Sequence, residues 1–346
     1  MDPADSEMSS PTTPGYLDYY DPFYFEDYRT KDRSYTKAVL EMPITLYGII
    51  FFLGIIGNGL VIWIAGFRMK KTISAVWFLN LAIADFLCCF SLSLRIAPWT
   101  YNISFPSVSS YICLVNFILF NLNMSASVLL LTAMSVDRWV SVMWPFWAKI
   151  NRTCKLVRIT VTIIWVLSLL WTGLLLFLYG VWVLETSEWC AETRHYVVYR
   201  HSIKQTIQLI RLFIMFVIPF LIIFTSYVTI FLKLRKSNRP QRSQRPYRII
   251  TAVILCFFIC WAPYYIWPLT PMYDDEDDIR FFTVNTIIII LACLNSCINP
   301  IIYVFMGQHF RHGFLRSIPF RLEKAISDPP DEPCIEQENC VLTTDV

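Results

Sequence analysis

Charged residues are scarce in this sequence: they make up 16% of its 346 residues, whereas hydrophobic residues make up 56%. A soluble domain usually carries about a quarter of its residues as charged side chains. The apolar surface left over must therefore face lipid or fill a very large core. The formal net charge of only +3 also argues against nucleic acid as a partner. The shortage of charge thus favours a membrane protein.

Residue groups that carry catalysis are missing as well. No nucleophile is placed with a base and no metal-ligand cluster is visible, so the sequence does not favour an enzyme. A transporter predicts an inverted repeat or several charges along a path, and neither is found. Residues 1–41 lack an apolar core segment, so we expect no cleavable signal peptide.

Long apolar runs are what the sequence has instead. A helix needs about 20 apolar residues to cross a bilayer, and seven runs are long enough. None alternates with the period of barrel strands, and helices satisfy their backbone groups within one segment. We therefore expect an all-α membrane protein, a seven-transmembrane helix bundle. The predicted spans are 42–66, 72–98, 111–136, 156–184, 212–232, 249–272 and 281–306.

Lys and Arg gather in the connections after the first, third and fifth spans and after the last one. These segments should be cytoplasmic, because positive loops stay inside. The opposite side is acidic, so we expect a multi-pass plasma-membrane protein with its amino end outside. The predicted parts are an extracellular acidic, tyrosine-rich tail (1–41), the bundle (42–306), a short amphipathic eighth helix (307–320) and a cytoplasmic tail (321–346).

The predicted outer side carries three kinds of modification candidate. Cys113 and Cys190 are the two cysteines that fall there, and in an oxidising compartment they form the natural disulfide pair. Asn102 begins a glycosylation sequon. Acid-flanked tyrosines suggest sulfation, which would add charge to a rim that steers basic ligands; the alternative is a merely solubilising tail. These tyrosines are Tyr16, Tyr19, Tyr20, Tyr24 and Tyr28.

Polar residues inside the predicted spans are the next signal, because an ionisable group at membrane depth is costly. Asp85 is the clearest case. Together with polar residues of other spans it predicts an oxygen-lined pocket for an allosteric sodium ion; no other cofactor is expected. The alternative is a hydrogen-bond network without an ion. The polar residues are Asn58, Asn123, Ser127, Asn295 and Asn299.

Two further features suit helices that move. Asp137 and Arg138 are adjacent at the predicted cytoplasmic end of the third span, where we expect them to hold each other until Arg138 meets a partner protein. The alternative is a charge that snorkels to the interface. Pro263 follows Trp261 by two residues and permits a hinge, unless the bend is a static packing kink.

These motifs occur in order, one set per span: Gly57-Asn58, 80–85, Asp137-Arg138, Trp165, Pro219 with Tyr227, 260–263 and 299–303. Over about residues 40–320 the chain closely resembles rhodopsin-like (class A) G-protein-coupled receptors. Segments 77–82, 257–264 and 303–308 look like the leukocyte chemoattractant group, which includes the complement anaphylatoxin, formyl-peptide and chemerin receptors.

The resemblance implies a receptor for a chemoattractant peptide or small basic protein, signalling through inhibitory heterotrimeric G proteins in leukocytes. Arg211 matches a pocket arginine of this group. A non-signalling scavenger of the same fold is the alternative. Phe120 stands where an amine receptor would carry an acid, and the outer segments lack the extra cysteines of chemokine receptors.

The residues expected to bind the ligand are Arg211, Arg95, Lys204, Trp99, Asn121, Tyr264, Tyr265, Trp261 and Asn285. Those expected to serve activation and G-protein coupling are Asp137, Arg138, Tyr227, Phe257, Trp261, Pro263 and Tyr303. Membrane lipid and arrestin are further expected partners. A PDZ protein could bind the carboxyl-terminal Thr344-Asp345-Val346.

Overall fold

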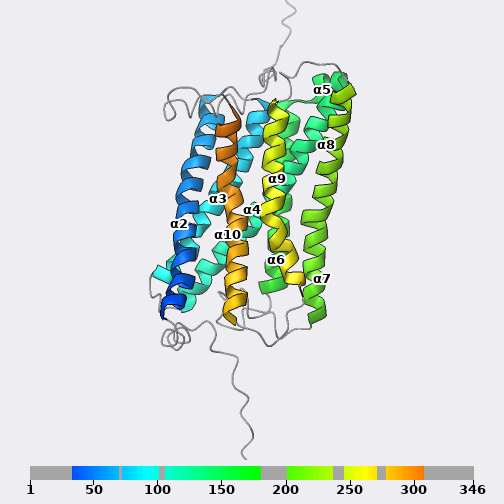
Figure 1. Cartoon of the computed structure of the whole chain (residues 1–346). Helices are drawn as coiled ribbons and strands as arrows, with labels where there is room; N and C mark the ends of the chain where they lie inside the picture. Colours follow the sequence, from blue (N-terminus) through cyan, green and yellow to red (C-terminus); the bar gives the residue numbers. More distant parts are fainter. Residues whose placement is uncertain are drawn as a thin grey trace, which may run out of the picture. The chain divides into compact units, whose positions relative to one another are not determined.

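The computed structural model describes residues 33–69, 72–100, 106–180, 201–236, 245–270 and 278–307. The chain divides into two units, Met1–Met42 and Pro43–Val346, and the second holds the helix bundle. Within the described ranges every regular element is helical and no strand occurs. Seven helical segments are long and apolar enough to cross a membrane, so the predicted fold class is confirmed (Figure 1).

The helices follow one another with short interruptions. They are α2 (Arg33–Trp63), the π-helix η1 (Ile64–Arg68), α3 (Ile73–Thr100), α4 (Pro106–Met143), α5 (Pro145–Asn151), α6 (Cys154–Gly180), α7 (His201–Leu212), the π-helix η2 (Phe213–Val217), α8 (Ile218–Lys236), α9 (Arg245–Ile266), the 3-10 helix η4 (Trp267–Leu269) and α10 (Asp278–Gly307). The segments α7, η2 and α8 together form the fifth crossing.

Several helices extend beyond the spans predicted from hydropathy. The helix α4 runs from Pro106 to Met143, and the fifth crossing starts at Gln205 rather than at 212. Hydropathy ends a span at the first polar cluster, whereas backbone hydrogen bonding continues past it. Arg211 therefore lies inside the fifth crossing and not at its edge. The short helix α5 was not predicted at all.

The helix α4 has the largest set of neighbours, since it packs against α3, α6 and α8, while α9 packs against α10. Every residue from 120 to 128 of α4 is buried. A helix that is buried all round can hold polar side chains only when other helices supply partners for them. This stretch therefore contributes to both polar sites described below.

Glycines let α2 approach its neighbours closely. A Cβ added at Gly57 would lie 2.9 Å from the Cβ of Pro300 in α10, and a Cβ at Gly54 would collide with the Cys89 thiol of α3. One residue after Gly57, the Nδ2 of Asn58 donates a hydrogen bond of 2.8 Å to the carbonyl oxygen of Ser296. The missing side chains thus bring Asn58 against α10.

Candidate functional site

A buried arginine joins three helices near one end of the crossing segments. Arg211 of α7 is 5% exposed. Its Nη2 donates 3.0 Å to the hydroxyl of Tyr264 in α9 and 3.5 Å to Oδ1 of Asn121 in α4. Its Nη1 donates 3.3 Å to Oε1 of Gln208, one turn earlier in its own helix. Burying a guanidinium is costly unless it is hydrogen-bonded, and these three uncharged groups offset part of that cost.

Aromatic rings line the surroundings of Arg211. Its guanidinium lies 5.4 Å from the centre of the Tyr264 ring. Phe120 of α4 contacts both Tyr264 and Trp261 of α9, with ring centres 5.4 and 5.3 Å apart. Trp261 in turn contacts Phe257 one turn along α9, at 5.9 Å. A continuous set of rings therefore leads from the arginine into the middle of the bundle.

The structure brings together five of the residues predicted to bind a ligand: Arg211, Asn121, Tyr264, Trp261 and Tyr265. Arg95 of α3 is placed differently, with its guanidinium 5.8 Å from the ring centre of Tyr47 in α2. Asn285 lies half-buried on α10. Gln208 was missed, although its spacing of three residues from Arg211 on a helix places the two on one face.

A second polar site surrounds the fully buried carboxylate of Asp85 in α3. Its Oδ1 accepts 3.1 Å from Nδ2 of Asn123 in α4, and its Oδ2 accepts 2.7 Å from Nδ2 of Asn299 in α10. The same Asn123 nitrogen lies 3.3 Å from the Ser127 hydroxyl. The predicted network between spans is thus present, with one member from each of three helices joined directly.

Several buried oxygens around this network have no hydrogen-bond partner within the described residues. They are Oδ1 of Asn58, Asn123, Asn295 and Asn299, and the Ser296 hydroxyl. Unsatisfied buried acceptors are rare and call for a missing donor, a water or an ion. A hard cation takes oxygen ligands of this kind. Asp85 and these oxygens therefore fit a sodium ion, while no cluster of three or more His, Cys, Asp or Glu suited to another metal occurs in the described ranges.

The third site lies at the end of the second unit where α3 and α6 begin and α4 ends. We call it the basic end, because Arg138, Arg152, Arg158 and Lys233 lie there. Capping fixes both helix starts: Thr72 accepts the amide of Ala75 at 3.2 Å in α3, and Thr153 accepts that of Leu156 at 3.3 Å in α6. The caps hold the neighbouring residues Ser74 and Arg152 in place.

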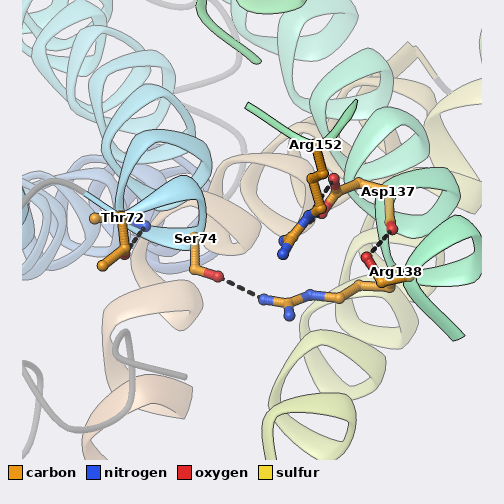
Figure 2. Close-up of polar contacts among 7 residues, drawn as sticks. Thr72, Ser74, Asp137, Arg138 and Arg152 are labelled. Carbon is orange, nitrogen blue, oxygen red and sulfur yellow. Dashed lines mark hydrogen bonds and ion pairs between the residues drawn. The ribbon is translucent and has the colours of Figure 1, made fainter. Parts of the chain in front are cut away.

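Arg138 and Asp137 of α4 point to different partners (Figure 2). The Nη2 of the buried Arg138 donates 2.6 Å to the hydroxyl of Ser74 in α3. Asp137 instead accepts two parallel hydrogen bonds from Arg152, Nε to Oδ1 and Nη2 to Oδ2, each 2.8 Å long. The expectation that Asp137 and Arg138 hold each other is wrong for this structure. Adjacent residues on a helix diverge by about 100° and do not face each other.

The other residues predicted for activation lie in and beside the core. Phe257 and Trp261 are fully buried, and Tyr227 is a half-buried member of the surrounding layer. Pro263 lies within α9. Near Asp137, Trp139 contacts Trp144 edge-to-face with ring centres 4.9 Å apart, at the junction of α4 and α5. No signal in the sequence placed Ser74 or Arg152 at this site.

Some predictions fall outside the described residues. The side chains of Trp99, Cys113, Lys204 and Tyr303 belong to this group, although their backbones lie in described helices. So do Asn102, Cys190, residues 308–320 of the predicted eighth helix and the predicted cytoplasmic tail. The five tyrosines Tyr16, Tyr19, Tyr20, Tyr24 and Tyr28 are also outside it.

Comparison with known proteins gives the same picture as the geometry. The sequence profile of the 7 transmembrane receptor (rhodopsin family) matches residues 57–303. A C5a anaphylatoxin chemotactic receptor 1 from Danio rerio is 37% identical over 88% of this chain and 88% of its own length. A human Chemerin-like receptor 1 is 36% identical, covering 90% of this chain and 87% of its own. A mouse Formyl peptide receptor 2 is 33% identical, covering 86% and 88%.

These matches agree with the resemblance to chemoattractant receptors seen in the motifs. They also extend over both buried polar sites and the basic end, since the profile spans the residues from Asn58 to Asn299. The chain belongs to the rhodopsin family of seven-transmembrane receptors, and it is therefore a multi-pass receptor of the plasma membrane and not an enzyme.

Proposed function

We propose that this receptor binds an extracellular chemoattractant peptide or small basic protein and activates a heterotrimeric G protein of the inhibitory family in leukocytes. The observation that carries the proposal is the buried Arg211, hydrogen-bonded to both α4 and α9 beside Trp261. Relatives named for C5a anaphylatoxin, chemerin and formyl peptide support a ligand of this class.

The chemistry of Arg211 favours a carboxylate, such as the carboxyl end of a peptide. A guanidinium presents parallel donors that match both carboxylate oxygens, and such bonds are stronger than those to neutral acceptors. An entering carboxylate would therefore displace Tyr264 and Asn121 as acceptors. The rings of Phe120, Tyr264 and Trp261 would contact the apolar side chains of the ligand.

Exchange of these acceptors gives the ligand a way to bias a two-state bundle. Tyr264 and Trp261 lie on the same face of α9, and Pro263 between them removes one backbone hydrogen bond. Releasing Tyr264 from Arg211 frees α9 from α7. A ligand can shift an equilibrium only through contacts that differ between its two states, and this contact differs.

We propose that Asp85 and its neighbouring oxygens hold a sodium ion that stabilises the resting state. The orphaned oxygens of Asn123, Asn295 and Asn299 support this role. The bound ion would supply a positive charge between α3, α4 and α10. An outward motion of one helix would separate the oxygens and release it.

The remaining roles concern the two sides of the membrane. We propose that the basic end is cytoplasmic and that Arg138, Tyr227 and Tyr303 meet the G protein, with arrestin and a PDZ protein as further partners. On the outer side we propose the Cys113–Cys190 disulfide, glycosylation at Asn102 and sulfation of the amino-terminal tyrosines. The excess of Lys and Arg in one set of connections supports this orientation.

The test measures dissociation of an inhibitory G protein in cells that express the receptor. The probes are carboxyl-terminal peptides of C5a and of chemerin, and a formyl peptide, each with a free or an amidated carboxyl end. We expect amidation of the active peptide to reduce potency by about 10- to 100-fold, because a hydrogen-bonded charge contributes roughly 1.5–3 kcal/mol. In Arg211→Ala the free and amidated peptides should be equally weak.

Arg95→Ala is the matched control, because it removes an arginine that lies over Tyr47 and not beside Tyr264. This variant should retain the effect of amidation. If amidation acts equally on the wild type and on Arg211→Ala, Arg211 does not bind the carboxylate. If a peptide binds without G-protein dissociation, the receptor is a scavenger and the signalling proposal fails.

A further inference from the structure

A cavity of about 250 Å³ lies at the basic end, apart from the three sites already described. Its walls come from Ala65 and Gly66 of η1, from Val76 and Leu79 of α3, and from Arg158 of α6. The first four are small or apolar, while Arg158 is exposed. The cavity thus combines an apolar interior with one positive charge.

Local structure explains why space remains here. The π-helix η1 is wound more widely than an α-helix and ends α2 with small residues. Farther along, α3 and α6 are tied together by Trp165, whose Nε1 donates 3.0 Å to Oδ1 of Asn80. The Nδ2 of Asn80 donates 2.8 Å to the carbonyl oxygen of Val76. Asn80, which lines the cavity, is therefore already engaged through both of its polar atoms.

The surface around the cavity faces the membrane. Leu156, Ile159 and Ile163 of α6 are each about half exposed, and Phe67 of η1 is 81% exposed. Such a surface in a membrane-spanning helix contacts lipid chains. Arg158 lies about 6 Å along α6 from its first residue, at 1.5 Å per residue. That depth corresponds to lipid headgroups, where arginine is found at the ends of membrane spans.

We propose that this cavity binds one anionic glycerophospholipid of the inner leaflet. A phosphate oxygen of the lipid accepts hydrogen bonds from Arg158, since the guanidinium fork matches phosphate geometry. One acyl chain lies against Gly66, Val76 and Leu79. The nearby Arg68 and Lys155 add positive charge, which favours an anionic headgroup over a zwitterionic one.

The engaged state of Asn80 decides between a lipid and a polar ligand. A polar molecule would need hydrogen-bonding partners inside the cavity, and the lining there is otherwise alanine, glycine, valine and leucine. An acyl chain needs none. Continuity with the lipid-facing surface of α6 and η1 gives the chain a direct path of entry.

Native mass spectrometry of the purified full-length receptor tests the proposal. The probes are phosphatidylserine and phosphatidylcholine with identical acyl chains, supplied together. We expect one phosphatidylserine to bind in preference, and Arg158→Gln to lower its occupancy about tenfold. Arg235→Gln is the matched control, because Arg235 is an exposed arginine in the last turn of α8 and does not line the cavity. It should leave the occupancy unchanged.

A second pair of variants tests the acyl-chain contact. A Cβ at Gly66 would lie 3.7 Å from Cδ1 of Leu79, which is an ordinary contact. Gly66→Ala should therefore retain phosphatidylserine, whereas Gly66→Leu should fill the cavity and lose it. Thermal melting of each variant confirms that it is folded. The proposal is overturned if Arg158→Gln and Arg235→Gln behave alike, if Gly66→Leu binds normally, or if a sterol displaces phosphatidylserine from the site.

Discussion

Arg152 occupies both carboxylate oxygens of Asp137 through two hydrogen bonds of 2.8 Å (Figure 2). This pair links the end of α4 to the junction between α5 and α6. It leaves Arg138 to bond Ser74 on α3. The acid and the base that are neighbours in sequence therefore tie α4 to two different parts of the basic end.

Breaking the Asp137–Arg152 pair should lower the stability of the receptor. The two side chains are only 12% and 14% exposed, so the pair lies between a surface pair, worth about 0–1 kcal/mol, and a buried one, whose disruption costs about 3–5 kcal/mol. We expect a coupling of about 1–3 kcal/mol in a double-mutant cycle of Asp137→Asn and Arg152→Gln, measured by unfolding of the purified protein. Strictly additive losses would show that the pair contributes nothing.

Removing the hydroxyl of Ser74 should raise the basal activity of the receptor. Ser74→Ala deletes the acceptor of Arg138, and a hydrogen bond from a charged donor contributes about 1.5–3 kcal/mol. If that bond holds Arg138 away from the G protein, its loss shifts the two-state equilibrium toward the active form. Nucleotide exchange on the G protein without ligand measures the effect, which should be several-fold.

The control for this prediction is Ser141→Ala. The Ser141 hydroxyl bonds the backbone oxygen of Asp137 within its own helix, at 2.8 Å. Losing it leaves Arg138 bonded to Ser74, so basal exchange should stay at the wild-type rate. Equal exchange in Ser74→Ala and in the wild type would mean that the Ser74 contact does not restrain Arg138.

Replacing Asp85 by asparagine should abolish any dependence of agonist affinity on sodium. The ion requires the negative charge of the carboxylate, and Asp85→Asn keeps the shape without the charge. In the wild type we expect sodium to weaken agonist binding relative to choline at equal ionic strength, which separates ion binding from screening. Radioligand competition measures both.

Ser91→Ala is a suitable control, because the Ser91 hydroxyl is buried in the same helix but bonds the carbonyl oxygen of Cys88 at 2.7 Å. It should retain the response to sodium. A sodium response that persists in Asp85→Asn would place the ion elsewhere, and the network would then serve to join helices only.

The sequence allowed the Asp85 network to be predicted, because a carboxylate and amides inside apolar runs can be satisfied only by one another. It did not allow the partner of Asp137 to be predicted. Arg152 lies in a connection, so its place depends on the Thr153 cap and the packing of α5, which no local pattern records. Likewise, hydropathy excluded Arg211 from its span, although tertiary partners on α4 and α9 bury it.

The packing of α2 on α10 provides a last prediction. A methyl group at Gly57 would lie 2.9 and 3.0 Å from two ring carbons of Pro300, and a proline ring cannot rotate away. Gly57→Ala should therefore destabilise the receptor by about 1–3 kcal/mol, as overpacking does. Gly48→Ala in the same helix is the matched control, since a Cβ there meets nothing within 4 Å. Alanine favours a helix over glycine by about 1 kcal/mol, so this control should be neutral or slightly stabilising in the same unfolding measurement. Equal stability of the two variants would show that α2 can shift away from Pro300 at little cost, and glycine would then not set the distance between these helices.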